Sequence, residues 1–359
     1  MKRMLGGLLL LALAAPAAGE TPRIRLPEGF RLSVFAENLP GVRFMALSPT
    51  GELTVSRPKA GQILLLPDRN GDGRADRTIV FARKLDRPHG LAWKGGALYV
   101  AETGAILKLE DRNGDGVSEK QETLTRDLPA GGGHWTRTLV FGPDGGMYVS
   151  VGSSCNACRE KDPRRATVLR FSPDGKRLTI FARGLRNSVG LAFHPITKEL
   201  WGTDNGRDYL GDDLPPDELN AIKQGGDYGW PGCYGDKRVD PSFGTRASCE
   251  KTLSPALSFP AHVAPLGIAF YTGKKFPSEY QNDAFVAFHG SWNKSKPDGY
   301  KVIRVRFRQG RPTGWKDFAT GFLRNGEAWG RPVDVLVARD GALLVSDDKG
   351  GRIFRISYR

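Results

Sequence analysis

The sequence has few of the residues and patterns that attach haem, cross membranes or build helical folds. Only five histidines and four cysteines occur among 359 residues. After residue 19 no stretch approaches the roughly 18 uninterrupted apolar residues that a membrane-spanning helix needs. Arg159 follows the CxxC pair where the histidine of a CxxCH motif would stand, which excludes haem attachment there. Long helical hydrophobic periods are also missing, so strands are expected to form the fold.

Residues 1–19 have the pattern of a secretory signal peptide. Two basic residues precede a short apolar run, Leu5 to Ala15, and small residues follow the run. The rest of the chain, residues 20–359, is therefore expected to be one periplasmic or secreted domain without stable membrane insertion. In such a compartment four cysteines indicate disulfides. Cys233 and Cys249 flank a polar loop and are expected to pair, whereas Cys155 and Cys158 could form a disulfide or a redox pair.

The formal charge of +14 raises the question of a nucleic-acid partner. Lysine and arginine are scattered along the chain, no basic helical stripe is present, and export would remove the usual partner. The charge therefore favours a local anion site, or docking to an acidic electron acceptor, over nucleic-acid binding.

One strand-turn-strand unit recurs along the chain, in a sequence with 46 glycines and 24 prolines. Its copies are FMALSPTGELTVS from Phe44, PHGLAWKGGALYVAETG from Pro88, TRTLVFGPDGGMYVSVGS from Thr136, SVGLAFHPITKELWGTDNG from Ser188, APLGIAFYTG from Ala264 and RPVDVLVARDGALLVSDD from Arg331. Six such units predict an all-β fold, a six-bladed β-propeller, with an open β-sandwich as the alternative.

Each copy is preceded by a strand that ends in a phrase similar to F-A-x-x-L. The first phrase, at residues 35–39, has no blade before it, so this N-terminal strand is expected to complete the last blade and close the ring. The stretch between Asn205 and Ala264 is longer than a blade requires. Long loops on a rigid ring often build the functional site.

Two acidic loops, one blade apart, resemble calcium-binding loops. The second matches D-x-N-x-D-G-x5-E. Its candidate oxygen ligands are Asp111, Asn113, Asp115, Glu119 and Glu122. The first loop offers Asp68, Asn70, Asp72 and Asp76, but Ile79 replaces the final glutamate. Each loop could hold Ca²⁺ and rigidify a turn, or could be a solvated turn without metal.

A histidine and several cations stand at corresponding places in the blades. His134 comes just before the innermost strand of its blade, where a base could take a hydroxyl proton. Arg186 and Asn187 open the next inner strand, and a guanidinium beside an amide suits a planar polycarboxylate. Asn205, Gly206, Arg207, Lys294 and Arg331 lie near other strand ends. Together they predict a cationic channel.

At these residues the chain resembles the glucose/sorbosone dehydrogenase family of soluble sugar dehydrogenases that depend on pyrroloquinoline quinone (PQQ). The phrases that carry the resemblance are GLRNSVGLAFHP, DELNAIKQGGDYGWP, GGGHWTRTLVFGPDG and VGSSCNAC. The family fold is a six-bladed propeller with PQQ and Ca²⁺ over its central channel. The last phrase is closer to sorbosone-dehydrogenase-like members than to the glucose enzymes.

The resemblance implies a role for each matched residue. His134 would be the general base, and Arg186 would bind the cofactor and stabilise charge on the reduced quinone. The other expected cofactor ligands are Asn187, Asn205, Lys294 and Arg331, and the main-chain carbonyls of Gly206 and Arg207 would hold Ca²⁺. One departure is Ser153, where glucose enzymes carry an acid that can orient the base.

The activity implied is oxidation of a sugar or sugar-derived aldehyde by hydride transfer to PQQ, with an external acceptor such as a c-type cytochrome. Two other functions fit a propeller. A calcium-dependent lactonase would need several carboxylates around one channel metal, with Asp204, Asp334 and Asp347 as candidates. A non-catalytic binding propeller would need none of this chemistry.

Overall fold

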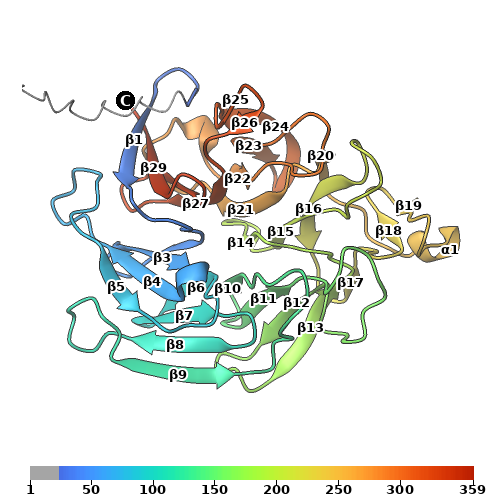
Figure 1. Cartoon of the computed structure of the whole chain (residues 1–359), viewed down its shortest axis with the longest axis horizontal. Helices are drawn as coiled ribbons and strands as arrows, with labels where there is room; N and C mark the ends of the chain where they lie inside the picture. The colour runs from blue at the N-terminus through green and yellow to red at the C-terminus, as the bar shows by residue number, and fades with distance from the viewer. Residues whose placement is uncertain (1–23) are drawn as a thin grey trace, which may run out of the picture.

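The structure is a computed structural model that describes residues 24–359, so the expected signal peptide at residues 1–19 lies outside the described residues. Six antiparallel sheets stand around a common centre, as Figure 1 shows. The prediction of an all-β, six-bladed propeller is therefore confirmed.

The first three blades follow one another along the chain. Blade 1 contains β2 (Met45–Leu47), β3 (Leu53–Arg57), β4 (Gln62–Leu66) and β5 (Ile79–Ala82), with the short helix η1 (Pro58–Ala60). Blade 2 contains β6 (Gly90–Lys94), β7 (Ala97–Ala101), β8 (Ile106–Glu110) and β9 (Lys120–Thr125). Blade 3 contains β10 (Leu139–Phe141), β11 (Met147–Val151), β12 (Thr167–Phe171) and β13 (Leu178–Arg183).

The last three blades complete the ring. Blade 4 contains β14 (Leu191–Phe193), β15 (Leu200–Asp204), β16 (Pro216–Ile222) and β20 (Leu257–Ala261). Blade 5 contains β21 (Pro265–Phe270), β22 (Ala284–Phe288), β23 (Lys301–Arg308) and β24 (Arg311–Ala319), with η2 (Ser278–Tyr280). Blade 6 contains β27 (Pro332–Val337), β28 (Leu343–Asp347), β29 (Arg352–Tyr358) and β1 (Phe30–Ala36).

The ring closes where its first and last strands meet. The N-terminal strand β1 pairs antiparallel with β29, in a register that joins Phe30 to Tyr358 and Val34 to Phe354. The expected closure by the N-terminal strand is thus confirmed. Through this closure β1 supplies the outer strand that blade 6 would otherwise lack, so β29 is paired on both of its sides.

A long excursion leaves blade 4 between β16 and β20. It adds β17 (Gly226–Asp227) to the outer edge of blade 3 in parallel, and it then forms the hairpin β18 (Cys233–Tyr234) and β19 (Arg238–Val239) and the helix α1 (Arg246–Cys249). The disulfide Cys233–Cys249 ties the hairpin to the helix, as expected from the sequence. Cys155 and Cys158 are also joined. A second small hairpin, β25 (Leu323–Arg324) and β26 (Glu327–Ala328), precedes blade 6.

The core lies between neighbouring sheets and at the centre of the ring. Nearly every residue of the middle strands is buried, as in β4, β11 and β22, so both faces of each blade pack against a neighbouring blade. At the centre, Phe44, Val189, Leu266 and Val333 come from four different blades, are buried, and pack together. All four lie at, or just before, the start of the first strand of their blade. None of the helices in residues 24–359 is long and apolar enough to cross a membrane.

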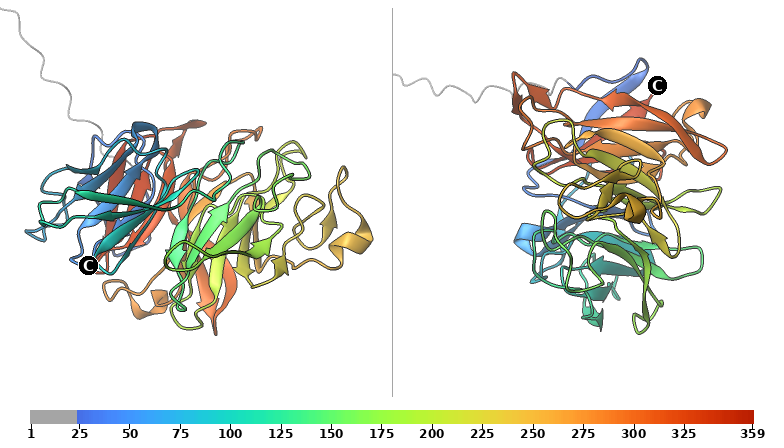
Figure 2. Two further views of the ribbon diagram at one scale, coloured as in Figure 1. Left: turned by 90° about the horizontal axis from the view of Figure 1, so that it is seen from below. Right: turned by 90° about the vertical axis from the view of Figure 1, so that its right-hand side faces the viewer.

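The antiparallel order of each blade sorts its loops between the two ends of the ring. Loops that enter the first strand or leave the second strand open at one end, and turns after the first or third strand open at the other. The edge-on views in Figure 2 show loops projecting at both ends. His134, Arg186 and Asn205 all belong to the first set. The acidic loops, which join third to fourth strands, belong to the second set.

Candidate active site

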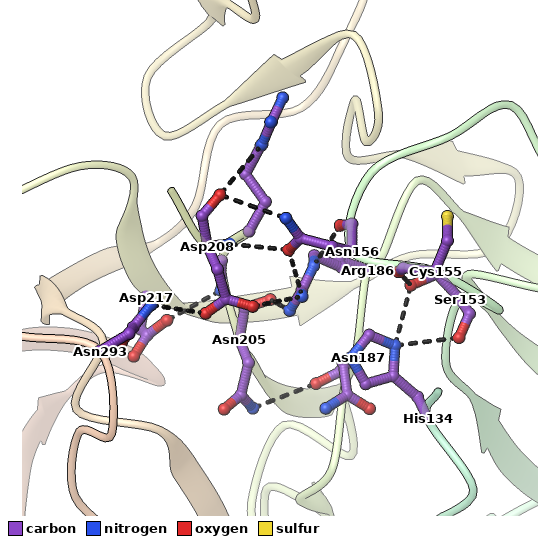
Figure 3. Close-up of polar contacts among 12 residues, drawn as sticks. His134, Ser153, Cys155, Asn156, Arg186, Asn187, Asn205, Asp208, Asp217 and Asn293 are labelled. Atoms are coloured by element: carbon purple, nitrogen blue, oxygen red, sulfur yellow. Dashed lines mark hydrogen bonds and ion pairs between the residues drawn. The ribbon is translucent and has the colours of Figure 1, made fainter. Parts of the chain in front are cut away.

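His134 precedes blade 3, and its ring is held by the loop that follows β11. Its Nδ1 atom lies 2.9 Å from the carbonyl oxygen of Ser153 and 2.8 Å from the hydroxyl oxygen of the same residue, as Figure 3 shows. A carbonyl oxygen can only accept a hydrogen bond, so Nδ1 carries the ring proton. No described residue makes a hydrogen bond with Nε2, which is therefore the nitrogen that can accept a proton.

The His134 imidazole is neutral in this environment. Burial, reinforced by the positive charge of Arg186, lowers the pKa of His134 to about 3. Ser153 is fully buried, and its hydroxyl donates to the carbonyl of Cys155 at 2.7 Å. The hydroxyl oxygen is therefore left to accept from His134. A neutral serine thus orients the ring at the position where the resemblance led us to look for an acid.

Arg186 is buried beside this histidine, and the protein uses most of its hydrogen-bonding capacity. Nε donates to the main-chain oxygen of Asn156 at 2.8 Å, and Nη2 donates to the side-chain oxygen of Asn156 at 2.9 Å and to Asp208 at 3.4 Å. Nη1 donates to the carbonyl of Asn205 at 3.1 Å. These contacts occupy four of the five N–H groups of a guanidinium. One N–H on Nη1 remains for a ligand.

The amide of Asn187 lies close to the histidine because a glycine separates them. A Cβ added at Gly152 would lie 2.5 Å from the Cβ of His134 and 2.7 Å from Oδ1 of Asn187. Only glycine permits this approach. The side-chain amide of Asn187 has no hydrogen-bond partner among the described residues, so both its oxygen and its nitrogen are available to a ligand.

The chain segment after β15 carries the expected metal and cofactor positions. Asn205 donates from its side chain to the carbonyls of Asn187 at 3.2 Å and Pro265 at 3.0 Å, so it bridges blades 4 and 5. The Gly206 N–H is bound by a buried aspartate, and the Arg207 guanidinium by Asp240 at 2.8 Å. Within residues 24–359, nothing donates a hydrogen bond to the carbonyl oxygens of Gly206 and Arg207.

The loop after β22 reaches the site through an asparagine. Nδ2 of Asn293 donates to Oδ1 of Asp208 at 2.7 Å, and Asp208 also contacts Arg186. The neighbouring Lys294 extends instead toward Asp298, with 3.6 Å between Nζ and the carboxylate. Lys294 thus lies on a loop that is attached to the site, but its ammonium group is not bonded to the cluster around Arg186.

Arg331 belongs to a separate charged group between blades 5, 6 and 1. It donates to the carbonyls of His289 at 3.0 Å and Gly290 at 2.8 Å. Asp348 joins this group by accepting from His289 at 3.0 Å and from Arg43 at 2.7 Å. No hydrogen bond or ion pair in the described part of the chain connects Arg331 to Arg186. The two cations therefore do not form one contiguous network.

The carboxylates that a lactonase would need do not surround one metal position. Asp204, Asp334 and Asp347 are buried, and each accepts hydrogen bonds from main-chain N–H groups near the start of an inner strand. Burial raises the pKa of Asp204 to about 8 and that of Asp334 to about 7. Among residues 24–359, none of them belongs to a cluster with metal-ligand spacing. These side chains cap strands, which removes the support for that alternative.

The second acidic loop does gather carboxylates, but at the other end of the ring. Oxygen atoms of Asp111, Asp115 and Glu119 all lie within 4.8 Å of one another. Asn113 stays beside them through its contacts with Asp115. Glu122 does not join this group, contrary to the expectation from the sequence. It lies in β9, where the pleat directs its carboxylate to Lys120 at 3.7 Å.

The first acidic loop repeats the turn but not the cluster. Asp68 accepts from the N–H of Gly73, Asn70 contacts Asp72, and Asp76 accepts from the N–H of Arg69 at 2.8 Å. The described residues of this loop form no group of three close carboxylates. The loop is therefore the weaker candidate of the two, although the final glutamate that it lacks takes no part in the cluster of the second loop.

Chelation tests whether the second loop binds Ca²⁺. We expect removal of Ca²⁺ to lower the melting temperature even without any cofactor, because a metal that binds only the folded state stabilises it. The substitution Asp115→Asn removes one charge and keeps an oxygen for the N–H of Val117, which Asp115 binds at 2.8 Å. This variant should lose most of the calcium-dependent shift. An equal shift in the variant would show that the stabilising ion binds elsewhere.

Sequence reasoning missed two residues that hold the site together. Asn156 and Asp208 bind Arg186 and each other, with 2.8 Å between the N–H of Asp208 and the side-chain oxygen of Asn156. Asn156 lies between the two cysteines of the CxxC motif, and the sequence analysis considered only the pairing of those cysteines. Asn156 belongs to the phrase VGSSCNAC, which carries part of the family resemblance and could have indicated that this residue lies in the site.

Comparison with known proteins places the chain in a family. A family model described as "Domain of unknown function (DUF7133)" matches residues 42–349. The chain belongs to this family. An uncharacterized protein of Borreliella burgdorferi is 32% identical over 374 aligned residues, which cover 98% of this chain and 95% of that protein.

The chain also shares its fold and distant sequence similarity with sugar dehydrogenases. A pyrroloquinoline quinone-dependent sugar dehydrogenase of Hypocrea jecorina is 25% identical, over 91% of this chain and 87% of that protein. The calcium structure of a Trichoderma reesei enzyme of carbohydrate-active family AA12 superimposes with a TM-score of 0.83 at 24% identity, over 94% of this chain and 98% of that one. The expected relationship to soluble PQQ-dependent sugar dehydrogenases is confirmed.

Proposed function

We propose that the protein is a PQQ-dependent oxidoreductase that oxidises a sugar or a sugar-derived aldehyde. The observation that carries the proposal is the pairing of a fixed base with a buried cation. Nδ1 of His134 is hydrogen-bonded to Ser153, and Nε2 has no hydrogen-bond partner within residues 24–359. The charge of the nearby Arg186 guanidinium contributes to the lowered pKa of His134. A non-catalytic propeller has no need for a base that is oriented in this way.

The groups that remain available fit a planar anion and a divalent cation. PQQ carries three carboxylates, and the free N–H of Arg186, the amide of Asn187 and the ammonium of Lys294 are suitable partners for them. The carbonyl oxygens of Gly206 and Arg207 suit Ca²⁺, which prefers oxygen ligands. Asn205 and Arg331 donate to main-chain carbonyls in the structure, so they would hold the walls of the site and contact the cofactor only after a shift.

The residues of the chain would act on the substrate as base and charge stabiliser. PQQ, when bound, supplies the carbon that accepts a hydride. Nε2 of His134 takes the proton from the substrate hydroxyl or aldehyde hydrate, while Ser153 keeps the other ring nitrogen protonated. The positive charge of Arg186 favours any negative charge that develops nearby, and its burial strengthens this effect because water does not screen it.

The reaction also needs an external acceptor to remove the electrons. We propose a c-type cytochrome or another acidic acceptor, because the formal charge of +14 favours such a partner. We place the protein in the periplasm or outside the cell, on the evidence of the apolar segment within residues 1–19.

Titration of PQQ and Ca²⁺ into the protein tests the function. We expect a bound-quinone absorption spectrum that saturates with cofactor, followed by reduction of an artificial dye on addition of aldoses or sugar aldehydes. Omitting Ca²⁺ should weaken both signals. If the spectrum is only that of free PQQ at millimolar cofactor, the protein is a binding propeller of another kind. Saturable binding without dye reduction by any sugar would reject the substrate class while retaining the cofactor.

A further inference from the structure

The loop between β11 and β12 touches both halves of the site. Ser153 receives the hydrogen bond from His134, and three residues later Asn156 receives two hydrogen bonds from Arg186. The disulfide Cys155–Cys158 closes a small ring around Asn156. The segment 153–158 is therefore the one stretch of the described chain that is bonded to the base and to the cation together, as Figure 3 shows.

The hydrogen bonds of this segment depend on its backbone conformation. The hydroxyl of Ser153 donates to the carbonyl of Cys155, which is a half-cystine of the ring. With its proton directed to that carbonyl, the hydroxyl acts toward His134 as an acceptor, beside the carbonyl oxygen of Ser153 itself. The carbonyl and side-chain oxygens of Asn156 both face the guanidinium of Arg186. A change of one peptide orientation would break both arrangements.

Other contacts fix the segment from outside. Ser154 accepts from the N–H of Gly133, next to His134, at 2.8 Å. Both its N–H and its hydroxyl donate to Glu160, at 2.6 Å and 2.7 Å. The side-chain amide of Asn156 also donates to the carbonyl of Asp208 at 3.3 Å. A polar surface loop without a cross-link samples many conformations, so the disulfide supplies the constraint that keeps these contacts in register.

We propose that segment 153–158, closed by the Cys155–Cys158 disulfide, is a positioning element that sets the tautomer of His134 through Ser153 and the orientation of Arg186 through Asn156. Ser153 and Asn156 act through other residues and are positioning residues. The consequence for the cofactor rests on the proposed function, whereas the consequence for the His134 ring does not. The two ideas can therefore fail separately.

The first test uses protein without cofactor and reads the histidine ring directly. In ¹⁵N-labelled protein we expect the His134 ring to show one tautomer, with the proton on Nδ1. The double substitution Cys155→Ser/Cys158→Ser should replace this signal by that of a mixed population. The control is Cys233→Ser/Cys249→Ser, which removes the other disulfide and should leave the single tautomer. Melting curves of both variants show that they are folded.

The second test reads the cation and uses PQQ with Ca²⁺. Asn156→Ala should weaken PQQ affinity roughly tenfold, because Arg186 loses a side-chain acceptor and becomes free to rotate. Asn156→Asp keeps an acceptor for Nη2 of Arg186 but loses the amide that donates to the carbonyl of Asp208, so it should recover part of the affinity, which a purely structural loop defect would not explain. A single Nδ1–H tautomer retained in the Cys155→Ser/Cys158→Ser variant would overturn the role assigned to the disulfide-closed segment at His134, and parent-like PQQ affinity of Asn156→Ala would overturn the role assigned to Asn156 at Arg186. Failure of the parent protein to bind PQQ would reject the function and leave the ring test decisive.

Discussion

Replacing His134 by alanine is expected to reduce turnover by a factor of about 10² to 10⁴ while leaving PQQ affinity close to that of the parent. General bases contribute rate factors of this size. The structure gives the reason for the separation of effects. The hydrogen bonds of His134 go to Ser153, and none goes to Arg186, Asn187 or Asn205. Steady-state dye reduction at saturating cofactor, together with calorimetric titration of PQQ, measures the two quantities independently.

A second histidine provides a matched control for this experiment. His194 is buried, whereas His134 is partly exposed, and His194 lies in the turn after β14, at the opposite end of the blade, where its Nδ1 accepts from the N–H groups of Ile196 and Thr197. His194→Asn should lower the melting temperature and keep the parent turnover number. If His134→Ala oxidises substrate at the parent rate, another group takes the proton, and His134 is a structural residue like His194.

The ring of blades was predictable because each blade repeats one local pattern. The strands alternate apolar residues with period two, and turns rich in glycine and aspartate separate them, so every blade can be recognised without knowledge of its neighbours. The closing strand was predictable for the same reason, since residues 35–39 repeat a phrase that elsewhere ends an outer strand. Strand β17 was not, because its two residues, Gly226 and Asp227, form no pattern that could be recognised.

The site was only partly predictable because it depends on contacts between distant loops. The spacing of His134, Arg186 and Asn205 relative to the inner strands placed them at one end of the ring, and the structure brings them together there. The sequence showed Ser153 where glucose enzymes carry an acid and left open what orients His134; in the structure Ser153 itself contacts the ring. The contacts of Arg186 with Asn156 and Asp208 join three separate loops. No local sequence pattern indicates that these loops come into contact.

The expected group of cations shows the same limit. Arg186, Lys294 and Arg331 were placed together because they occupy equivalent blade positions. The structure keeps Arg331 on the carbonyls of the blade 5 loop and turns Lys294 toward Asp298. Equivalent positions in a propeller fix the backbone position from which a side chain extends. Rotamers and neighbouring charges decide where its polar end lies.

Replacing Arg186 by lysine is expected to weaken PQQ binding about ten- to a hundredfold, which corresponds to about 1.5–3 kcal/mol for a charge-assisted contact. Lysine retains the charge but offers three donors from one point, whereas the guanidinium distributes five donors over a plane. In the structure four of those donors bind Asn156, Asn205 and Asp208. An ammonium group cannot satisfy these acceptors and a ligand at the same time.

The same substitution should slow turnover at saturating PQQ and lower the stability of the protein, so a control must separate binding from folding. Arg304 is suitable because its guanidinium is only 11% exposed, binds Asp283 at 2.7 Å and lies over the ring of Tyr280, on blade 5 and away from His134. Arg304→Lys should also lose stability, since its buried carboxylate partner is left poorly paired. It should keep the parent affinity for PQQ. If Arg186→Lys behaves like Arg304→Lys, with lower stability but parent-like affinity and turnover, then Arg186 only closes the ion pair with Asp208. A loss of affinity confined to Arg186→Lys would instead show that the one N–H left free on Nη1, and the charge behind it, belong to the cofactor site.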